Sequence, residues 1–321
     1  MRFLREVALL GCGLMLLVTW YPAEVSASSI SIQNQTPLIG NVVNDEKKLL
    51  EATVNLYCQI KVGGKNISMT GTGVLIDARG IILTNAHVAQ YFLLNGEDSK
   101  LDADCSVRIG SPAKEKYSAL VLYISKDWLA TKAKKSTKES TKSTGEDDFA
   151  LLYITKAKNN KLPTQFPYAP LSTANQIKKG NEVTVAGYPS GDLKYKEIRN
   201  KLTAKTATTT ITNLQSFQSN TADLISLSRT KFASAGISGG PVMLSNTVVG
   251  IVVTRSTSKS KEGASLRALS TSYIDREITN ETGLTLVTLY AGDLSVRAEE
   301  TRASISTATL SAIEKSLRVL R

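Results

Sequence analysis

The chain contains a single histidine, and the residues around it restrict the possible folds more than any other feature of the sequence. His87 lies in the segment LTNAHV, residues 83–88. Far downstream, Ser238 lies between glycines in the segment GISGGP, and Asp148 lies between the two. An imidazole, an acid and a serine are the parts of a triad in which the imidazole takes the serine proton and the acid orients the imidazole. With one histidine in the chain, no second imidazole can act as the base.

The order of the three residues along the chain separates three folds. The segment around Ser238 also fits the Gly-x-Ser-x-Gly elbow of α/β-hydrolases, in which the acid and then the histidine follow the serine. No histidine follows Ser238 here. The subtilisin order is acid, histidine, serine; Asp45 and Asp77 precede His87, but the chain lacks the strand–helix alternation of that fold. The order His87, Asp148, Ser238 is the chymotrypsin order.

The three segments resemble those of trypsin-like serine proteases with the chymotrypsin fold. They are most similar to the bacterial Deg-like branch, and the resemblance covers roughly residues 50–275. It implies that Ser238 attacks a peptide carbonyl, that His87 is the general base and that Asp148 orients the imidazole. By the same resemblance, the backbone N–H groups of Gly236 and Ser238 form the oxyanion hole.

Each segment alone also has an ordinary interpretation. A lone histidine is more often a core or surface residue than a catalytic one, and Asp148 could simply end a loop before the strand 149–154. Residues 236–240 could be a glycine-rich turn. Asp147 is a neighbouring acid, but the pattern Asp-x-Ala-Leu before an apolar strand favours Asp148. The coincidence of three segments in one order favours the triad.

The alignment to Ser238 also predicts the substrate pocket. Its floor lies near Phe232, and its wall strand contains Val253 and Thr254. None of these residues is acidic, so we do not expect cleavage after lysine or arginine. A small or medium apolar side chain is favoured, although Arg255 could instead favour an acidic one.

Ile237 occupies a position at which digestive members of the family carry an aspartate. That aspartate pairs with a new N-terminal amine after zymogen cleavage. Isoleucine cannot pair with a charge, so we expect no activation of this kind, although residues 38–40, LIG, loosely resemble such an N-terminus.

Many short apolar segments separated by turns predict an all-β fold. The strand candidates are residues 53–62, 71–76, 81–84, 105–109, 119–124 and 149–154, followed by 182–187, 206–212, 223–227, 242–244, 248–254 and 266–269. This pattern alone fits a sandwich or a barrel. The resemblance to the chymotrypsin fold implies two six-stranded antiparallel β-barrels, with the active site in the cleft between them. The proline-rich segment 163–170 would link the barrels.

This pattern divides the chain into five parts. We expect a signal peptide at 1–27, a polar leader arm at 28–48, a first barrel at 49–160, a second barrel at 161–271 and a C-terminal helical extension at 272–321. In the extension, Leu310, Ile313, Leu317 and Leu320 fall on one helical face, which is typical of a packing surface. Too few residues follow Ile274 for the PDZ domain that most Deg-like proteases carry.

The N-terminus is typical of a secretory signal. Arg2 and Arg5 precede the apolar residues 7–20, and small residues at 25–27 predict cleavage after Ala27. The apolar run is shorter than the roughly 20 residues that span a bilayer. Two alternatives remain: the segment stays as an uncleaved anchor, or Leu9 to Cys12 is a lipobox, for which too little apolar sequence precedes the cysteine. We expect an exported protein that is secreted, periplasmic or in the cell envelope.

Without the signal segment, two cysteines remain, Cys58 and Cys105. An even pair in an exported protein favours a disulfide, and two buried free thiols are the alternative. One histidine and two cysteines cannot build a usual zinc site, so we expect no metal and no cofactor.

The net charge of +11 does not indicate nucleic-acid binding. The lysines gather at residues 131–142 among serines and threonines without aromatic residues, which predicts a solvated loop. The expected partner is a polypeptide substrate, with membrane contact only if the N-terminal segment is retained. The sequence favours a secreted or envelope serine endopeptidase; a catalytically silent relative that acts as a binding module, or a structural β protein of the envelope, is the alternative.

Overall fold

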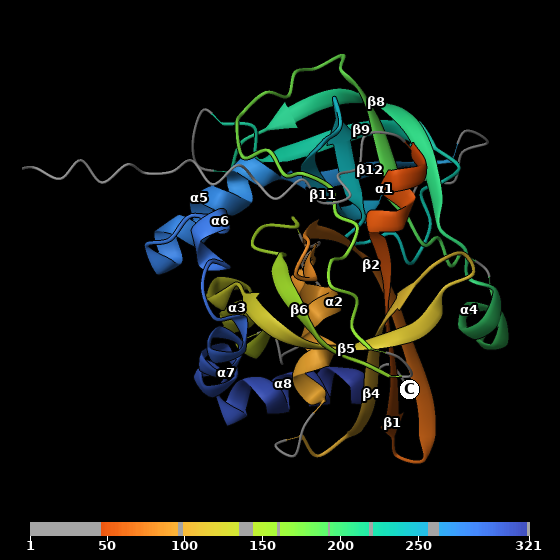
Figure 1. Cartoon of the computed structure of the whole chain (residues 1–321), viewed down its shortest axis with the longest axis vertical. Coiled ribbons are helices and arrows are strands. Elements are labelled where there is room, and N and C mark those ends of the chain that lie inside the picture. The colour runs from red at the N-terminus through yellow and green to blue at the C-terminus, as the bar shows by residue number, and fades with distance from the viewer. Residues whose placement is uncertain are drawn as a thin grey trace, which may run out of the picture. The chain divides into compact units, whose positions relative to one another are not determined.

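A computed structural model describes residues 46–95, 99–134, 144–158, 161–191, 193–217, 221–255 and 263–319, all of which belong to one compact unit. The described residues form two closed six-stranded antiparallel barrels, with helices at the C-terminal end of the chain (Figure 1). The all-β, two-barrel prediction is therefore confirmed. The expected signal peptide lies outside the described residues, as does most of the leader arm.

The first barrel has the strand order β1-β2-β3-β6-β5-β4. Its strands are β1 (Thr53–Val62), β2 (Lys65–Asp77), β3 (Ile81–Thr84), β4 (Asp102–Ile109), β5 (Lys114–Ile124) and β6 (Ala150–Ala157). Alternate residues of β1, from Val54 to Val62, belong to the barrel core, as a period of two requires. β3 pairs antiparallel with β6, and Thr84 lies opposite Ala150. The residues just after β3 and just before β6 therefore meet at one edge of the barrel.

The second barrel has the strand order β10-β11-β12-β9-β8-β7. Its strands are β7 (Glu182–Gly187), β8 (Lys205–Gln215), β9 (Leu224–Thr230), β10 (Pro241–Leu244), β11 (Thr247–Arg255) and β12 (Ala264–Ser270). Ser245 and Asn246 join β10 to β11 with φ angles of 48° and 66°, the left-handed values that a tight hairpin turn needs. Apolar side chains from all six strands form a core of its own, and other residues of these strands, among them Ile251 and Leu269, belong to the same cluster as the first-barrel core.

The segment between the barrels is extended, as its prolines predict. Phe166 N–H donates to Ala78 O at 2.8 Å, and Ala169 N–H donates to Leu75 O at 2.9 Å. One residue further on, Pro170 O accepts from Val248 N–H at 2.8 Å. The linker thus bonds to the first barrel and then to the second.

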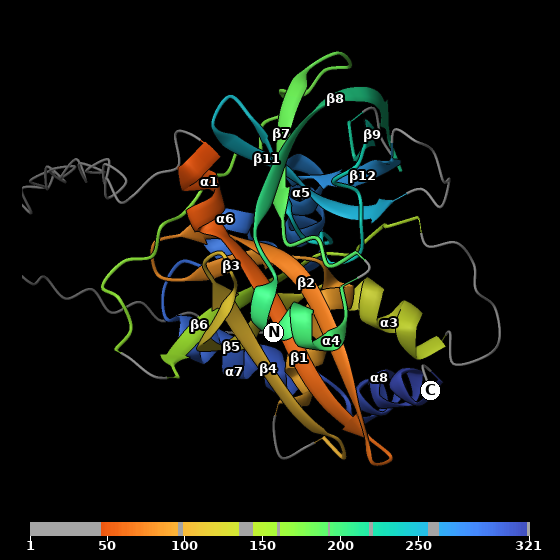
Figure 2. The same ribbon diagram turned by 90° about the vertical axis from the view of Figure 1, so that its right-hand side faces the viewer.

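Helices lie before, between and after the strands (Figure 2). They are α1 (Glu46–Ala52), α2 (Ala86–Ala89), the 3-10 helix η1 (Gln90–Leu94), α3 (Lys126–Lys134), α4 (Tyr195–Lys201), α5 (Thr271–Thr282), α6 (Leu286–Leu289), α7 (Leu294–Ser304) and α8 (Thr307–Val319). Two expectations need correction. Residues 46–48, assigned to the leader arm, begin α1, and residues 131–134, assigned to the lysine-rich loop, end α3. Residues 135–143 of that loop lie outside the described residues.

Of the C-terminal helices, α5 packs on β11 and β12 of the second barrel, whereas α7 and α8 pack on the first barrel and its helices. α7 contacts β5, and α8 contacts α3 and η1. Leu310, Ile313 and Leu317 are buried in the same core cluster as the first-barrel strands, which confirms the predicted packing face for these three residues. Leu320 lies outside the described residues. No helix in the described ranges has the length and apolar character needed to cross a bilayer.

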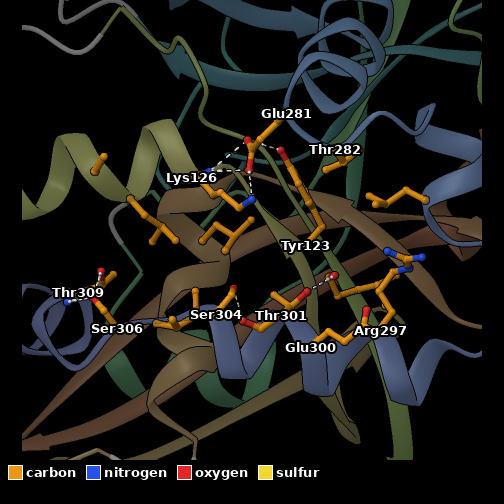
Figure 3. Close-up of a pocket in the computed structure, with 16 residues that line it drawn as sticks. Tyr123, Lys126, Glu281, Thr282, Arg297, Glu300, Thr301, Ser304, Ser306 and Thr309 are labelled. Carbon is orange, nitrogen blue, oxygen red and sulfur yellow. Dashed lines mark hydrogen bonds and ion pairs between the residues drawn. The ribbon is translucent and has the colours of Figure 1, made fainter.

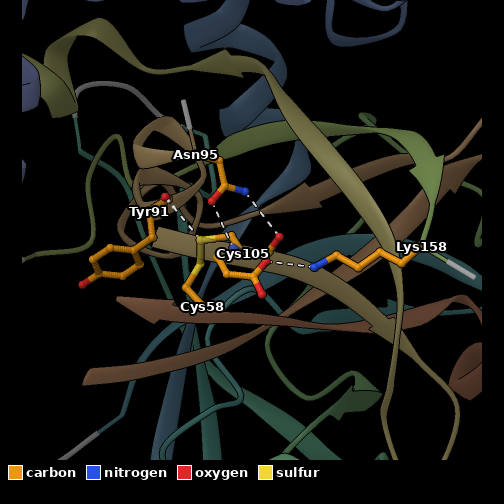
Figure 4. The surroundings of a disulfide bond; sticks show 6 residues. Cys58, Tyr91, Asn95, Cys105 and Lys158 are labelled. Carbon is orange, nitrogen blue, oxygen red and sulfur yellow. Dashed lines mark hydrogen bonds and ion pairs between the residues drawn. A yellow bond between two sulfur atoms is a disulfide. The ribbon is translucent and has the colours of Figure 1, made fainter. Parts of the chain in front are cut away.

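Cys58 and Cys105 form a disulfide between β1 and β4 (Figure 4). The two residues lie directly opposite each other in the register of these strands. Asn95, which follows η1, binds the backbone of Cys105 at two atoms. Its side chain accepts from Cys105 N–H at 3.0 Å and donates to Cys105 O at 3.3 Å. The predicted disulfide is therefore confirmed, and it closes the barrel beside the loop that follows His87.

Removing this disulfide is expected to destabilise the protein by about 2–4 kcal/mol, because the bond closes a long loop in the unfolded chain. The sequence separation of the two cysteines is 47 residues. The test compares guanidinium unfolding of the Cys58→Ala/Cys105→Ala variant with that of the parent, monitored by the fluorescence of the buried Trp128. A reductant should destabilise the parent by a similar amount and leave the double variant unchanged; a parent insensitive to reductant would contradict the prediction.

Candidate active site

His87 projects from a short helix that starts directly after β3. Asn85 precedes the helix in an extended conformation, and its carbonyl accepts from Val88 N–H at 3.2 Å. Ala86 and Ala89 are fully buried, so the helix packs on these small residues and leaves His87 on its open side. The imidazole is 36% exposed, which leaves it accessible from solution.

Asp148 holds His87 at two points. Its Oδ1 accepts from the backbone N–H of His87 at 2.8 Å, and its Oδ2 lies 2.6 Å from His87 Nδ1. Asp148 is buried, and its own carbonyl accepts from the Asn85 side chain at 2.8 Å. A carboxylate can only accept, so the proton of a neutral imidazole lies on Nδ1 and the lone pair on Nε2. The sequence prediction that Asp148, not Asp147, faces the imidazole agrees with this geometry.

The turn before Asp148 needs two residues with left-handed backbone. Gly145 has a φ of 92° and Asp147 a φ of 60°. Asp148 N–H donates to Gly145 O at 3.2 Å, and Phe149 N–H donates to Asp147 O at 2.9 Å. A Cβ on Gly145 would lie 2.9 Å from the side chain of Val253, so the turn packs closely on β11 of the second barrel.

Ser238 lies in the loop that leads into β10, and Thr72 of β2 holds this loop from the other barrel. The Thr72 hydroxyl donates to Gly236 O at 2.7 Å, and the Thr72 N–H donates to Ser238 O at 2.8 Å. The same hydroxyl accepts from Tyr188 N–H at 3.0 Å. Sequence reasoning missed Thr72, although its position between Gly71 and Gly73 was a signal.

Thr72 also connects the serine loop to the histidine. Its carbonyl accepts from the hydroxyl of Thr84, the last residue of β3, at 2.7 Å. Ser238 is half-buried, and the hydrogen bonds of the described residues include none between its hydroxyl and the His87 ring. Such bonds are often long in a free enzyme and shorten when substrate binds. The structure thus joins Asp148 to His87 directly and Ser238 to the same strands through Thr72.

The backbone N–H groups expected to form the oxyanion hole are unused. Within the described part of the chain, neither Gly236 N–H nor Ser238 N–H donates to a protein acceptor. Gly236 has a φ of 90°, and a Cβ there would lie 2.5 Å from Tyr188 O, so the loop requires glycine at this position. Ile237 between them is buried in the core of the second barrel. Two free donors beside the serine can bind an anionic oxygen.

The predicted pocket residues differ in their burial and in their surroundings. Phe232 is buried in the core of the second barrel, and Val253 is buried against Gly145. Thr254 is half-buried on β11, and the side chain of Arg255 lies outside the described residues. The structure therefore places Val253 and Thr254 on β11 and Phe232 in the core of the second barrel.

Among the hollows of the described residues, two lie beside the first barrel and away from the serine loop. One of about 40 Å³ adjoins His87, and Met69, Val88 and Tyr91 form part of its wall. The other, of about 360 Å³, lies between β5, α3 and the C-terminal helices, and none of the three triad candidates lines it (Figure 3). Within the described ranges, no three histidine, cysteine or carboxylate side chains gather to hold a metal ion.

The family model described as trypsin-like peptidase domain matches residues 71–251, more than half of the chain. The chain belongs to this family. The match contains His87, Asp148 and Ser238, and together with the two barrels it confirms the predicted resemblance to trypsin-like serine proteases. Membership of the Deg-like branch stays a prediction. No curated protein matches the chain.

Two glycines with similar backbone angles provide a test of the packing around Ser238. Gly239 and Gly283 have φ angles of 84° and 74°. A Cβ on Gly239 would lie 2.1 Å from Thr72 O, whereas a Cβ on Gly283 meets nothing within 4 Å. We expect Gly283→Ala to cost about 1–2 kcal/mol of unfolding free energy and Gly239→Ala more than about 3 kcal/mol. Guanidinium denaturation measures both, and equal losses would show that Gly239 does not make this close contact.

Proposed function

We propose that this protein is a serine endopeptidase that hydrolyses peptide bonds with Ser238 as nucleophile, His87 as general base and Asp148 as the orienting acid. The observation that carries the proposal is the two-point contact of Asp148 with the backbone and ring of His87. A buried carboxylate in this position leaves Nε2 of the imidazole as the proton acceptor. The family match and the free N–H groups of Gly236 and Ser238 support the same chemistry.

In the first half-reaction, Ser238 Oγ attacks the substrate carbonyl carbon while its proton moves to His87 Nε2. The negative charge that develops on the carbonyl oxygen is bound by the N–H groups of Gly236 and Ser238. Asp148 stays ionised and stabilises the imidazolium. When the C–N bond breaks, His87 gives its proton to the leaving amine, and the acyl group remains on Ser238.

In the second half-reaction, water replaces the amine. His87 takes a proton from the water, whose oxygen attacks the acyl carbon and forms a second tetrahedral intermediate. This intermediate collapses when the ester bond to Ser238 breaks and the serine regains its proton from His87. A carboxylic acid leaves, and the enzyme returns to its first state.

The enzyme would be competent without a new N-terminus. Ile237 is 2% exposed within an apolar core, and an amine brought there would have no charge to pair with. The Cys58–Cys105 disulfide supports a location outside reducing compartments. The disulfide is consistent with the proposed export. The cleavage after Ala27 and the five-part division of the chain remain proposals from the sequence.

Covalent labelling tests the nucleophile. The chain from Ser28 onward should react with a fluorophosphonate probe, and Ser238→Ala and His87→Ala should abolish labelling. Asp148→Asn should lower kcat by about ten-thousand-fold because it removes the acceptor that fixes the imidazole tautomer. Ser234→Ala is the matched control, since this serine lies in the same loop and its hydroxyl donates only to Ala235 O. A folded protein that does not label would contradict the enzyme and favour a silent relative that acts by binding.

Peptide substrates test the specificity for the residue before the scissile bond. Peptides with alanine or valine before the scissile bond should have a kcat/KM at least about tenfold above those with lysine or arginine, because no acid is predicted in the pocket to pair with a buried cation. A library of fluorogenic peptides that differ at this one position measures the ratio. A preference for glutamate would contradict the apolar pocket and assign specificity to Arg255.

A further inference from the structure

We propose that Tyr273, in the first turn of α5, is a positioning residue whose hydroxyl fixes the turn at Asp147 and so holds Asp148 against His87. The proposal rests on the proposed function, because it assigns a role in placing the triad acid. Tyr273 lies beyond the family match, which ends at residue 251, and no sequence pattern pointed to it.

The contact between Tyr273 and Asp147 involves both the side chain and the backbone. The Tyr273 hydroxyl donates to Asp147 Oδ1 at 2.9 Å and accepts from Asp147 N–H at 3.2 Å. One phenolic oxygen therefore binds two groups of a single residue, which restricts the rotation of that residue in both φ and χ1. Asp147 directly precedes Asp148, so this restriction acts on the residue that contacts His87.

The Asp147 conformation needs such support. A φ of 60° is the left-handed region, which costs a residue with a Cβ about 1–2 kcal/mol. If Asp147 relaxed toward the ordinary region, the peptide that leads into Asp148 would rotate. The carboxylate of Asp148 meets His87 at 2.8 Å and 2.6 Å, and two contacts of this length do not survive a shift of the backbone.

Tyr273 is itself rigidly held. Its N–H donates to the hydroxyl of Ser270, the residue that caps α5, and its ring packs edge-on against Phe149 and Phe217. The guanidinium of Arg276 lies 5.1 Å from the ring centroid and pairs with the fully buried Asp223 at 2.9 Å. The second barrel thus fixes α5, and α5 carries the hydroxyl to the acid turn of the first barrel.

Electrostatics support the same role. Burial raises the pKa of Asp147, and the hydrogen bond from Tyr273 lowers it. The hydroxyl therefore stabilises the charged carboxylate in a half-buried position. Without the hydroxyl, the Asp147 carboxylate would be desolvated there and would lack this hydrogen bond. A movement of the turn toward solvent would then lower its free energy.

The decisive variant is Tyr273→Phe, which removes one oxygen and keeps the ring packing. We expect kcat to fall about 10- to 100-fold, because a small displacement of the acid costs transition-state stabilisation. KM should change less than about twofold, since the residues that bind substrate are untouched. The unfolding free energy of the variant is measured in parallel to show that it is folded.

Tyr123→Phe is the matched control. Tyr123 is also a buried tyrosine whose hydroxyl donates to a carboxylate of α5, Glu281, at 2.7 Å (Figure 3). Its ring stacks on Phe149, which the variant keeps, and its hydroxyl makes no hydrogen bond to Asp147 among the described residues. We expect its kcat to stay within about twofold of the parent. A generic loss of packing between the first barrel and α5 would lower kcat in both variants alike and would overturn the proposal.

A second pair of variants acts on the partner residue. Asp147→Asn keeps an acceptor oxygen for Tyr273 and tolerates left-handed backbone, so it should retain activity. Asp147→Ala has neither the acceptor oxygen nor this backbone tolerance, so its kcat should fall as far as that of Tyr273→Phe. The double variant Tyr273→Phe/Asp147→Ala should be no worse than either single one, because both remove the same contact. Equal activity of Asp147→Asn and Asp147→Ala would overturn the proposal even if Tyr273→Phe did not fold.

Because the chain has one histidine, NMR can observe the His87–Asp148 contact directly, without an assay of activity. Proton NMR of the protein should show a low-field resonance from His87 Nδ1–H, and it should weaken or move upfield in Tyr273→Phe but not in Tyr123→Phe. An unchanged resonance together with an unchanged kcat would overturn the positioning role. If instead the parent fails to react with the fluorophosphonate but the resonance depends on Tyr273, the proposed function fails and the positioning inference stands.

Discussion

Thr72 is the contact on which the geometry of the whole site depends. Ser238 comes from the second barrel, whereas His87 and Asp148 come from the first, so the proposed triad needs a fixed distance between the two barrels. Thr72 provides it with three groups: its hydroxyl and N–H bind the carbonyls of Gly236 and Ser238, and its carbonyl accepts from the last residue of β3. In the same loop, Gly239 N–H donates to Val252 O at 2.7 Å, whereas the N–H groups of Gly236 and Ser238 donate to no acceptor among the described residues. These two N–H groups are the proposed oxyanion donors.

The His87–Asp148 pair follows from the register of β3 with β6. Thr84 and Ala150 face each other in the pairing of β3 with β6, so the residues a few positions beyond each strand end must meet. A register shift of one residue would exchange the buried Leu152 and Ile154 with the partly exposed Tyr153 and Thr155, and the loss of this burial opposes the shift. The free energy that maintains the core thus also maintains the alignment of acid and base.

This division explains what the sequence could predict. Alternating apolar residues and turn signals located the strands closely, since both are local properties; the predicted 53–62, 81–84 and 182–187 coincide with β1, β3 and β7. Glycines around Ser238 were informative for the same reason, because a left-handed turn requires them. Thr72 and Tyr273 were not predictable, because their partners are 164 and 126 residues away and threonine or tyrosine in a strand or helix has many ordinary uses. Helices α3 and α4 were missed because they are short or weakly patterned, and packing on the barrels stabilises them.

The C-terminal helices contact both loops that carry the first-barrel members of the triad. Tyr273 of α5 binds the turn before Asp148, and Arg302 of α7 donates to the carbonyl of Leu93 in η1, which continues the helix of His87. Both contacts come from outside the residues that the family model matches. These two contacts join the extension to the turn before Asp148 and to the helix that follows His87, in addition to its packing on the core.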